Sequence, residues 1–245
     1  CFRLSVKLPF LYFKGKSSLD FNLIIKSKDS YNAPARDVTF TSVPGRNGDL
    51  IQDNGRYLNV TIPYELCLVK RDARGFDELV SEVKNWLLSD SRYAQLWDSY
   101  DVRYFRYGAY SGGVDIKEEL RNYGECSISF NCKPYRYSFE GQTAVEIPSG
   151  GATLENAEML AAKPYIKIYG SGNISLHINS DTFTFENVSD YIEIDSETMN
   201  AYKGQSLQNN VMSGDGFPIL SPGTNAISFT GSVTKAEIVP RWCTL

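Results

Sequence analysis

The sequence predicts a mainly β protein with a single helix, and three observations carry that prediction. Short segments in which apolar and polar residues alternate recur along most of the chain, as they do in half-buried strands. Turn residues such as Gly, Pro and Asn separate these segments at short intervals, which is typical of antiparallel sheets. The chain also contains 16 Tyr, a residue that packs well on a pleated sheet and keeps a polar tip for interfaces.

The first predicted strands lead into a predicted arm. Residues 18–26 and 36–43 alternate well enough for strands. Two turn signals follow in succession, and each contains a glycine, Gly45 or Gly48, that accepts a positive φ without a steric cost. Alternation resumes after these turns, so residues 40–62 are expected to form an extended, hairpin-like arm.

The tip of this arm has few large apolar residues that could hold it against its own domain. Val43, Leu50 and Ile51 are the exceptions, and they need a partner surface. Arg46 and Asp49 can add polar contacts at the rim, where an exposed ion pair is worth about 0–1 kcal/mol. We therefore predict that these five residues contact a neighbouring subunit. An ordinary surface hairpin is the alternative.

One segment changes from the strand period to the helical period. Residues 75–88 place apolar side chains at i, i+3, i+4, i+7, i+10 and i+11, the pattern of an amphipathic helix, with Phe76, Leu79, Val80, Val83, Trp86 and Leu87. Such a stripe needs a sheet or another helix to cover it, so we expect its Val83, Trp86 and Leu87 side to be buried. Strand patterns return afterwards at residues 93–97, 102–110, 114–121 and 124–133.

A change in composition predicts two domains. Residues 141–157 are small, polar and Gly-rich, so we assign them to a linker. Residues 1–140 then form an N-terminal domain, and residues 158–245 form a C-terminal domain. In the C-terminal domain short strands follow one another with close turns, which predicts an antiparallel sandwich or jelly roll. These strands are expected at residues 164–169, 173–178, 181–186, 190–195, 225–230 and 233–239.

The chain offers no catalytic or metal-binding constellation. His177 is the only histidine, which excludes a site with several His ligands. The 5 Cys show no CxxC spacing, which argues against a zinc site or a disulfide framework and favours reduced core thiols. Glu193 and Asp195 share one strand face, whereas a glycosidase needs carboxylates that face each other across a cleft. We therefore expect no enzymatic activity, no cofactor, and no catalytic or metal-binding residue.

Charge and hydropathy exclude further classes. The formal net charge is −4, so the chain lacks the basic footprint of direct nucleic-acid recognition. No apolar run approaches the length that a membrane helix requires, so no membrane insertion is expected. Residues 2–13 are rich in apolar side chains, but Arg3 and Lys7 interrupt them and no small-residue cleavage site follows. A signal peptide is therefore not expected.

Three turn-and-strand stretches, in this order and at this spacing, resemble the distal tail protein family of siphophages, the long-tailed bacteriophages, and of prophage-derived tail elements. They are residues 43–50 (VPGRNGDL), 129–135 (SFNCKPY) and 223–229 (GTNAISF). The resemblance covers most of the chain, with further matching blocks at residues 17–21, 33–37, 54–57, 164–172, 195–202 and 241–242. No single block is specific, whereas their ordered set is much more so. Residues 1–10 depart from the family pattern.

The resemblance implies a structural role in the phage virion. Members of this family form hexameric rings at the far end of the tail tube. Each ring joins the tube protein to the tail-tip hub protein and, in many phages, to receptor-binding parts. The implied fold is an N-terminal β-sandwich or barrel-like domain that builds the ring, followed by a C-terminal galectin-like or carbohydrate-module-like β-sandwich. Reduced thiols fit assembly in the host cytoplasm.

A carbohydrate-binding β-sandwich module of a surface or secreted protein is the alternative function. Such a module would present exposed aromatic side chains together with Asn, Asp or Arg on one face of the sandwich. The C-terminal half holds Tyr191, Tyr202, His177 and Trp242, but the sequence shows no obvious cluster among them. The resemblance therefore favours the distal tail ring subunit over the sugar-binding module.

Overall fold

The computed structural model describes residues 8–28, 32–120 and 122–245, and the chain divides into two compact units. The N-terminal unit runs to Arg136 and also includes Leu245, whereas the C-terminal unit covers residues 137–244. Each unit has its own core of buried apolar side chains. The departure from the family pattern at residues 1–10 falls largely on residues 1–7, which lie outside the described residues.

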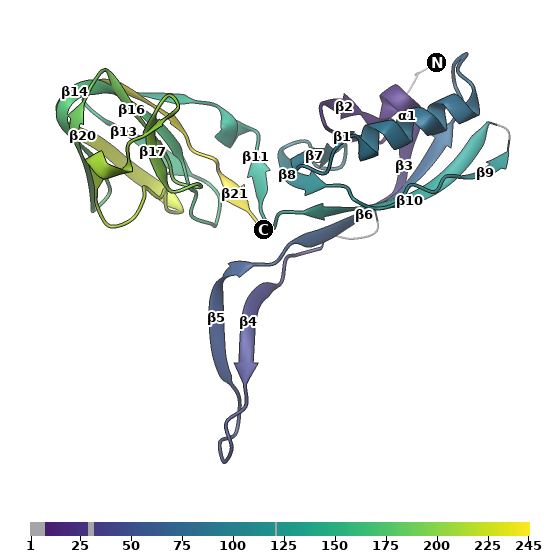
Figure 1. Cartoon of the computed structure of the whole chain (residues 1–245), viewed down its shortest axis with the longest axis horizontal. Coiled ribbons are helices and arrows are strands. Elements are labelled where there is room, and N and C mark those ends of the chain that lie inside the picture. The colour runs from purple at the N-terminus through teal and green to yellow at the C-terminus, as the bar shows by residue number, and fades with distance from the viewer. Residues whose placement is uncertain (1–7, 29–31, 121) are drawn as a thin grey trace, which may run out of the picture. The chain divides into compact units, whose positions relative to one another are not determined.

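An antiparallel sheet forms the N-terminal unit (Figure 1). Its strands run in the order β2 (Lys16–Ser17), β1 (Leu11–Phe13), β7 (Ala94–Asp98), β8 (Tyr104–Ala109), β10 (Tyr123–Cys132), β6 (Val60–Val69) and β3 (Leu23–Ser27), with β9 (Lys117–Leu120) paired to β10. The alternation seen in the sequence becomes alternating burial, most regularly in β6 and β10. Cys126 and Cys132 both face the core, as their six-residue spacing on one strand requires.

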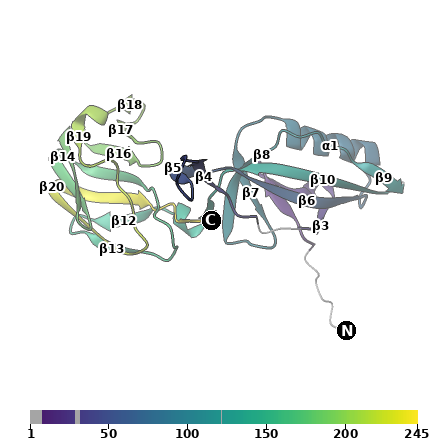
Figure 2. The ribbon, with the colours of Figure 1, turned by 90° about the horizontal axis from the view of Figure 1, so that it is seen from below.

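Helix α1 (Phe76–Leu88) covers this core, which confirms the helix predicted from the apolar period. At its start the Glu78 side chain accepts a hydrogen bond from the N–H of Gly75 at 3.3 Å. At its end Lys14 Nζ donates to the carbonyl oxygens of Leu87 (3.1 Å) and Asp90 (2.7 Å). These contacts satisfy groups that have no partner inside the helix. Figure 2 shows α1 beside strand β10, where Phe76 of the helix lies against Gly124.

Trp86 anchors the helix to the sheet. Its side chain is 5% exposed, and its indole stacks on the ring of Phe21 with centroids 4.7 Å apart. The indole N–H donates to the carbonyl oxygen of Phe13 at 2.9 Å, so the one polar atom of the ring is satisfied. Leu79, Val83 and Leu87 are fully buried beside it. The predicted buried side of the helix is thereby confirmed.

Replacement of Trp86 by alanine should destabilise the N-terminal unit by about 3–5 kcal/mol, because a large side chain leaves a well-packed site. Lys84→Ala on the exposed side of the same helix is the matched control and should change stability by less than about 0.5 kcal/mol. Chemical denaturation of the full chain, followed by far-ultraviolet circular dichroism, measures both. A Trp86→Ala change as small as the control would contradict this packing.

Two long strands organise the C-terminal unit as a β-sandwich. β14 (Tyr165–Ile178) and β20 (Gly223–Val239) pair with each other, and each exchanges its other partner partway along. β14 pairs first with β16 (Tyr191–Asp195) and then with β15 (Asp181–Val188), while β20 pairs first with β13 (Ala152–Asn156) and then with β12 (Val145–Pro148). Five further strands are β11 (Arg136–Ser138), β17 (Asn200–Lys203), β18 (Ser206–Leu207), β19 (Met212–Ser213) and β21 (Cys243–Thr244). Three short 3-10 helices are η1 (Ser18–Phe21, in the N-terminal unit), η2 (Glu140–Gln142) and η3 (Asn209–Val211).

Glycines mark the place where the long strands change partners. A Cβ atom on Gly170 would lie 2.4 Å from the carbonyl oxygen of Ser232, and one on Gly231 would lie 2.4 Å from that of Asn173. The register between β14 and β20 shifts at the same place, and Gly231 has a φ of +93°. Only glycine permits so close an approach of two backbones, so these positions allow the long strands to bend from one layer into the other.

The prediction that residues 141–157 form a linker is wrong. This stretch contains β12 and β13, both hydrogen-bonded to β20, and the side chain of Ile147 is fully buried. The division between the units falls after Arg136, ahead of the expected domain end at residue 140. Gly150 and Gly151 form the turn between the two strands, where Gly151 has a φ of +85°, while Gly141 lies in a short 3-10 helix. A Gly-rich composition suits a tight turn and a flexible linker equally well, and the pairing with β20 decides between them.

Replacement of Ile147 by alanine should therefore destabilise the C-terminal unit by about 2–5 kcal/mol, because the side chain is 0% exposed. Val145→Ala on the same strand is the matched control, since Val145 is 37% exposed and should lose less than about 1 kcal/mol. Differential scanning calorimetry of the full chain measures both variants. Two equally small effects would mean that residues 141–157 behave as a linker after all.

Candidate functional site

The predicted arm is a hairpin that forms a sheet of its own. β4 (Arg36–Thr41) pairs only with β5 (Leu50–Tyr57), and Figure 1 draws them as a separate two-stranded ribbon. The hairpin thus begins at Arg36, a few residues before the expected start at residue 40. Almost every side chain of β5 is exposed, in contrast to the alternating burial of the sheet strands. The arm is therefore ordered as a hairpin without being packed as part of a core.

Turn chemistry shapes the tip of the arm. Gly45 and Gly48 have φ angles of +78° and +83°, the conformations that their turn signals predicted. The N–H of Arg46 donates to the carbonyl oxygen of Val43 at 3.1 Å, which closes the first turn. The side chains of Arg46 and Asp49 form no hydrogen bond or ion pair with any residue that the structure describes.

Ion pairs across the strands hold the arm together. Arg36 binds Asp53 at 2.9 Å, and Arg56 binds Asp37 at 2.6 Å. The hydrogen bond from Asn54 and the pair with Arg56 lower the pKa of Asp37. The backbone N–H of Gly55 and the pair with Arg36 likewise lower the pKa of Asp53. Exposed pairs of this kind are individually weak, so they favour one register more than they add stability.

A large apolar pair on the arm is left without cover. Phe40 and Ile51 lie opposite each other on the two strands and are 59% and 62% exposed. Leu50 is also more than half exposed, and Val43 precedes the turn. An isolated two-stranded hairpin is at best marginally stable in water. We therefore expect a partner molecule to cover this apolar surface. Sequence reasoning placed Phe40 in a strand but missed it as a contact residue, because only the register shows that it faces Ile51.

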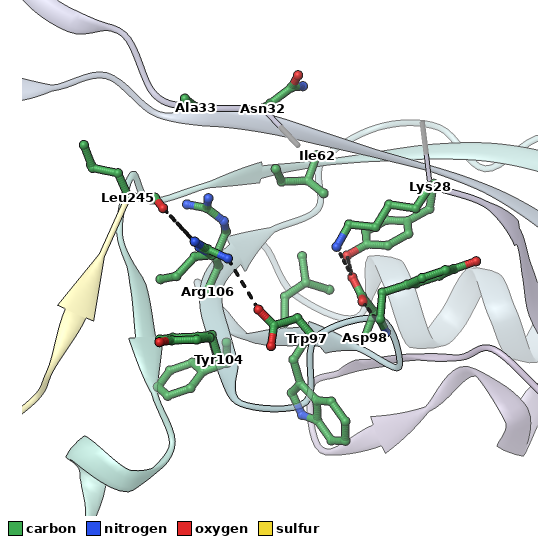
Figure 3. Close-up of a pocket in the computed structure, with 15 residues that line it drawn as sticks. Lys28, Asn32, Ala33, Ile62, Trp97, Asp98, Tyr104, Arg106 and Leu245 are labelled. Carbon is green, nitrogen blue, oxygen red and sulfur yellow. Dashed lines mark hydrogen bonds and ion pairs between the residues drawn. The ribbon is translucent and has the colours of Figure 1, made fainter. Parts of the chain in front are cut away.

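A cavity of about 200 Å³ with both polar and apolar lining residues lies at the base of the arm, within the N-terminal unit (Figure 3). Asn32 and Ala33, which lead into β4, form part of its wall. The end of β7, the loop after it and the start of β8 form another part. The remaining charged or polar residues that line it are Lys28, Tyr64, Asp98, Tyr100, Asp101, Tyr104, Arg106 and Arg136. No sequence pattern pointed to this cavity, since its residues come from segments far apart in the chain.

Asp98 is the buried acid of this cavity, and it is fully engaged. Its carboxylate pairs with Lys28 Nζ at 2.7 Å and accepts from the Tyr64 hydroxyl at 2.7 Å. The N–H of Tyr100 donates to its second oxygen at 2.9 Å. Burial and the nearby carboxylate raise the pKa of Tyr64 well above its ordinary value, so this tyrosine stays protonated as a donor.

The two arginines of the cavity have different surroundings. Arg136 pairs with Asp101 at 3.4 Å and donates to the carbonyl oxygen of Leu245 at 3.1 Å and 3.0 Å. Arg106 donates to the carbonyl oxygens of Pro134 and Lys133, and no carboxylate among the described residues pairs with it. Burial lowers the pKa of Arg106, and the positive charge of Arg136 adds to this.

Four tyrosines gather on one face of the C-terminal unit, which the sequence did not reveal. Tyr169 and Tyr191 are cross-strand partners, with ring centroids 6.3 Å apart, and Tyr165 lies 6.5 Å from Tyr202. The polar groups between them already bind each other. Glu193 accepts from the Tyr165 hydroxyl at 2.7 Å and from a backbone N–H at 2.9 Å. Little hydrogen-bonding capacity is left there for a sugar.

The other candidate chemical groups are also occupied by structural contacts. Arg241 binds both carboxylate oxygens of Asp195, at 2.6 Å and 3.1 Å. The His177 ring lies 3.0 Å from the Thr182 hydroxyl, with no acid or nucleophile pair. Within the described ranges no three His, Cys, Asp or Glu side chains gather in a way that could hold a metal ion. No helix of the described part is long and apolar enough to cross a membrane.

Comparisons with known proteins find one matching domain model and several similar structures. Residues 14–132 match the model of the phage tail protein RIFT-related domain. The chain is similar to the Dit protein of phage SPP1, described as a paradigm of the hub adsorption apparatus in phages that infect Gram-positive bacteria. The identity is 12%, the likeness covers 98% of this chain and 100% of that chain, and the TM-score is 0.71.

A second likeness concerns the baseplate of phage p2. The chain is similar to a chain in the structures of that baseplate in its activated conformation, with strontium and with calcium. In both, the identity is 13%, the likeness covers 95% of this chain and 97% of that chain, and the TM-score is 0.51. No curated protein sequence matches this chain.

The matched residues correspond to one part of the structure. Residues 14–132 contain the strands from β2 to β10, helix α1 and the whole arm. The likeness to the SPP1 Dit protein extends over both units and shows the same mainly β fold. Residues 14–132 therefore match a phage tail protein RIFT-related domain, and the chain as a whole has the fold of the SPP1 Dit protein.

Proposed function

We propose that this chain is the distal tail ring subunit of a siphophage tail or of a prophage-derived tail element. Its role is to connect the tail tube to the tail-tip hub and to the host-adsorption apparatus. The observation that carries this proposal is that two similarities to known phage tail proteins occur in the same chain. The phage tail domain matches the N-terminal unit, and the fold of the SPP1 Dit protein extends over nearly the whole chain.

The partners follow from the same role. Six copies form a ring whose neighbours are the tail tube protein on one side and the tail-tip hub protein on the other. A receptor-binding protein is a further partner where the tail carries one. The subunit is assembled in the host cytoplasm and becomes part of the virion. The uncovered Phe40–Ile51 pair supports this, because a hairpin with an exposed apolar surface suits a subunit buried among others.

The arm is the element that we assign to ring closure. Its candidate contact residues Val43, Arg46, Asp49, Leu50 and Ile51 all lie in the tip or at the start of β5. A closed ring uses heterologous contacts, in which one patch meets a different patch on the next copy. A protruding hairpin supplies one such patch, since it presents a surface that its own unit does not cover.

The role is structural and not enzymatic. Glu193 and Asp195, the acids considered for glycoside hydrolysis, each bind partners inside the unit. Binding of a carbohydrate by the tyrosine face is the alternative, and the internal hydrogen bonds of that face are evidence against it.

Because Glu193 and Asp195 are engaged within the unit, the purified chain should leave bacterial wall polysaccharides intact. Hydrolysis that Glu193→Gln abolishes would overturn the structural role.

Removal of the arm tip should abolish the ring while the unit still folds. We would delete residues 40–51 and join Thr39 to Gln52, which are cross-strand partners, through an Asn-Gly turn. Native mass spectrometry in the presence of the tail tube and hub proteins should show hexamers for the intact chain and smaller species for the shortened one. The thermal unfolding of the two should agree within a few degrees, because the removed segment contributes no core residue.

Leu120→Ser is the matched control for this experiment. Leu120 is a large exposed apolar residue on β9 instead of the arm, so its replacement should leave the ring intact. A shortened chain that still forms the same hexamer would show that the arm is not the closing element. An intact chain that forms no ring with its tube and hub partners would contradict the proposed function itself.

A further inference from the structure

Arg106 is a largely buried cation that lacks an acidic partner. Its guanidinium uses one nitrogen to donate to the carbonyl oxygens of Pro134 and Lys133. The two acids that line the cavity have other partners: Asp101 pairs with Arg136 and Arg103, and Asp98 pairs with Lys28. Buried guanidinium groups are normally paired, because an uncompensated charge in a site of low polarity costs free energy. The Arg106 guanidinium in the cavity wall can therefore bind a carboxylate that the described residues do not supply.

Asp49 is the counterpart at the other end of the arm. It lies in the tip between β4 and β5, it is exposed, and no described cation pairs with it. The two residues that follow it, Leu50 and Ile51, are exposed apolar side chains. The tip thus presents a carboxylate followed by an apolar surface. The cavity is lined by Arg106 and by Tyr100, which is half exposed, and Val102 is exposed in the loop that contains Tyr100.

The tip cannot reach the cavity of its own chain. Asn32 and Ala33 line the cavity and lead directly into β4, so the cavity is at the base of the arm. An extended β5 of 8 residues places the tip roughly 26 Å away from that base, given about 3.3 Å per residue. The carboxylate that fits Arg106 must then come from another molecule, and a tip-to-base contact joins two different patches. Such a contact repeats from copy to copy and generates a ring or a filament.

We propose that the arm tip of one copy binds in the cavity of the next copy, with Asp49 of the first pairing with Arg106 of the second. Leu50 and Ile51 of the arm then pack beside Tyr100 and Val102 of the receiving copy. This inference rests on the proposed ring function and deepens it, since it names the surface that receives the arm. It also accounts for the two unpartnered charges and for the exposed apolar residues at both ends of the contact.

A charge-reversal cycle tests the pair. Asp49→Arg and Arg106→Glu should each weaken the ring, raising the protein concentration needed for half assembly by about tenfold or more, as loss of a desolvated charge pair does. The double variant restores opposite charges and should recover most of the assembly. Asp181→Arg, a charge reversal on an exposed residue of β15, is the matched control and should leave assembly unchanged. Sedimentation velocity with the tube and hub proteins present measures all four.

A second measurement keeps the test decisive if Arg106→Glu fails to fold. A chain carrying Leu50→Cys together with Tyr100→Cys should form a disulfide between copies under mild oxidation, and neither single variant should do so. The native thiols Cys126, Cys132 and Cys243 react slowly, because burial raises their pKa values to about 12, 12 and 11. Cys67 is only partly buried, so Cys67→Ser is included in every variant; burial raises its pKa as well.

The outcomes separate this inference from the proposed function. If Asp49→Arg and Arg106→Glu both leave the ring unchanged, or if the double variant fails to recover what the single variants lose, the pairing is overturned. The pairing is also overturned if no cross-link forms between copies of the double cysteine chain. In each case a ring that is still lost on deletion of the arm tip would leave the ring function standing. A ring that never forms with intact chains would remove both.

Discussion

The position of β6 is the constraint on which the N-terminal unit depends. This strand pairs with β10 along its whole length and with β3 on its other side, and its alternate side chains enter the core under helix α1. It also continues from the arm after only two residues, Leu58 and Asn59. Asn59 donates to the Tyr93 hydroxyl at 2.7 Å and to Asn131 at 2.8 Å, which fixes the junction. The packing of one buried strand therefore holds the base of an arm that has no core of its own.

The two units solve the problem of exposed sheet edges in different ways. In the C-terminal unit two long strands bend and exchange partners, so each layer of the sandwich continues into the other. The bend requires glycine at positions where the backbones nearly touch. The arm leaves both edges of a two-stranded ribbon unpaired among the described residues, and its strands carry several charged side chains that bind each other. Arginine–aspartate pairs keep such a hairpin soluble and in register until a partner covers it, which is the behaviour expected of an assembly element.

Charge distribution links the fold to its role. Polar and charged groups on the tyrosine face and along the strands of the arm bind each other within the same unit, so these groups already have partners. Arg106 and the tip residues Arg46 and Asp49 differ because their partners are not among the described residues. On the proposed structural role, the functional residues are those that find their partners only in the assembly. The proposed contact joins two such charges, Arg106 at the base of the arm and Asp49 at its tip.

Local patterns in the sequence determined the elements of this protein. The 3.6-residue period predicted helix α1 and its buried Trp86, because one face of a helix must be apolar wherever it packs. The turn signals around Gly45 and Gly48 and the alternation beside them predicted the hairpin, and the ordered blocks pointed to the tail protein family. Tertiary structure alone decided the rest. The Gly-rich stretch at 141–157 became a strand, a turn and another strand because β20 was there to pair with it. Phe40 was placed opposite Ile51 by strand register, and Arg106 was brought to the base of the arm by sheet topology. Such contacts depend on distant partners, and no local pattern records them.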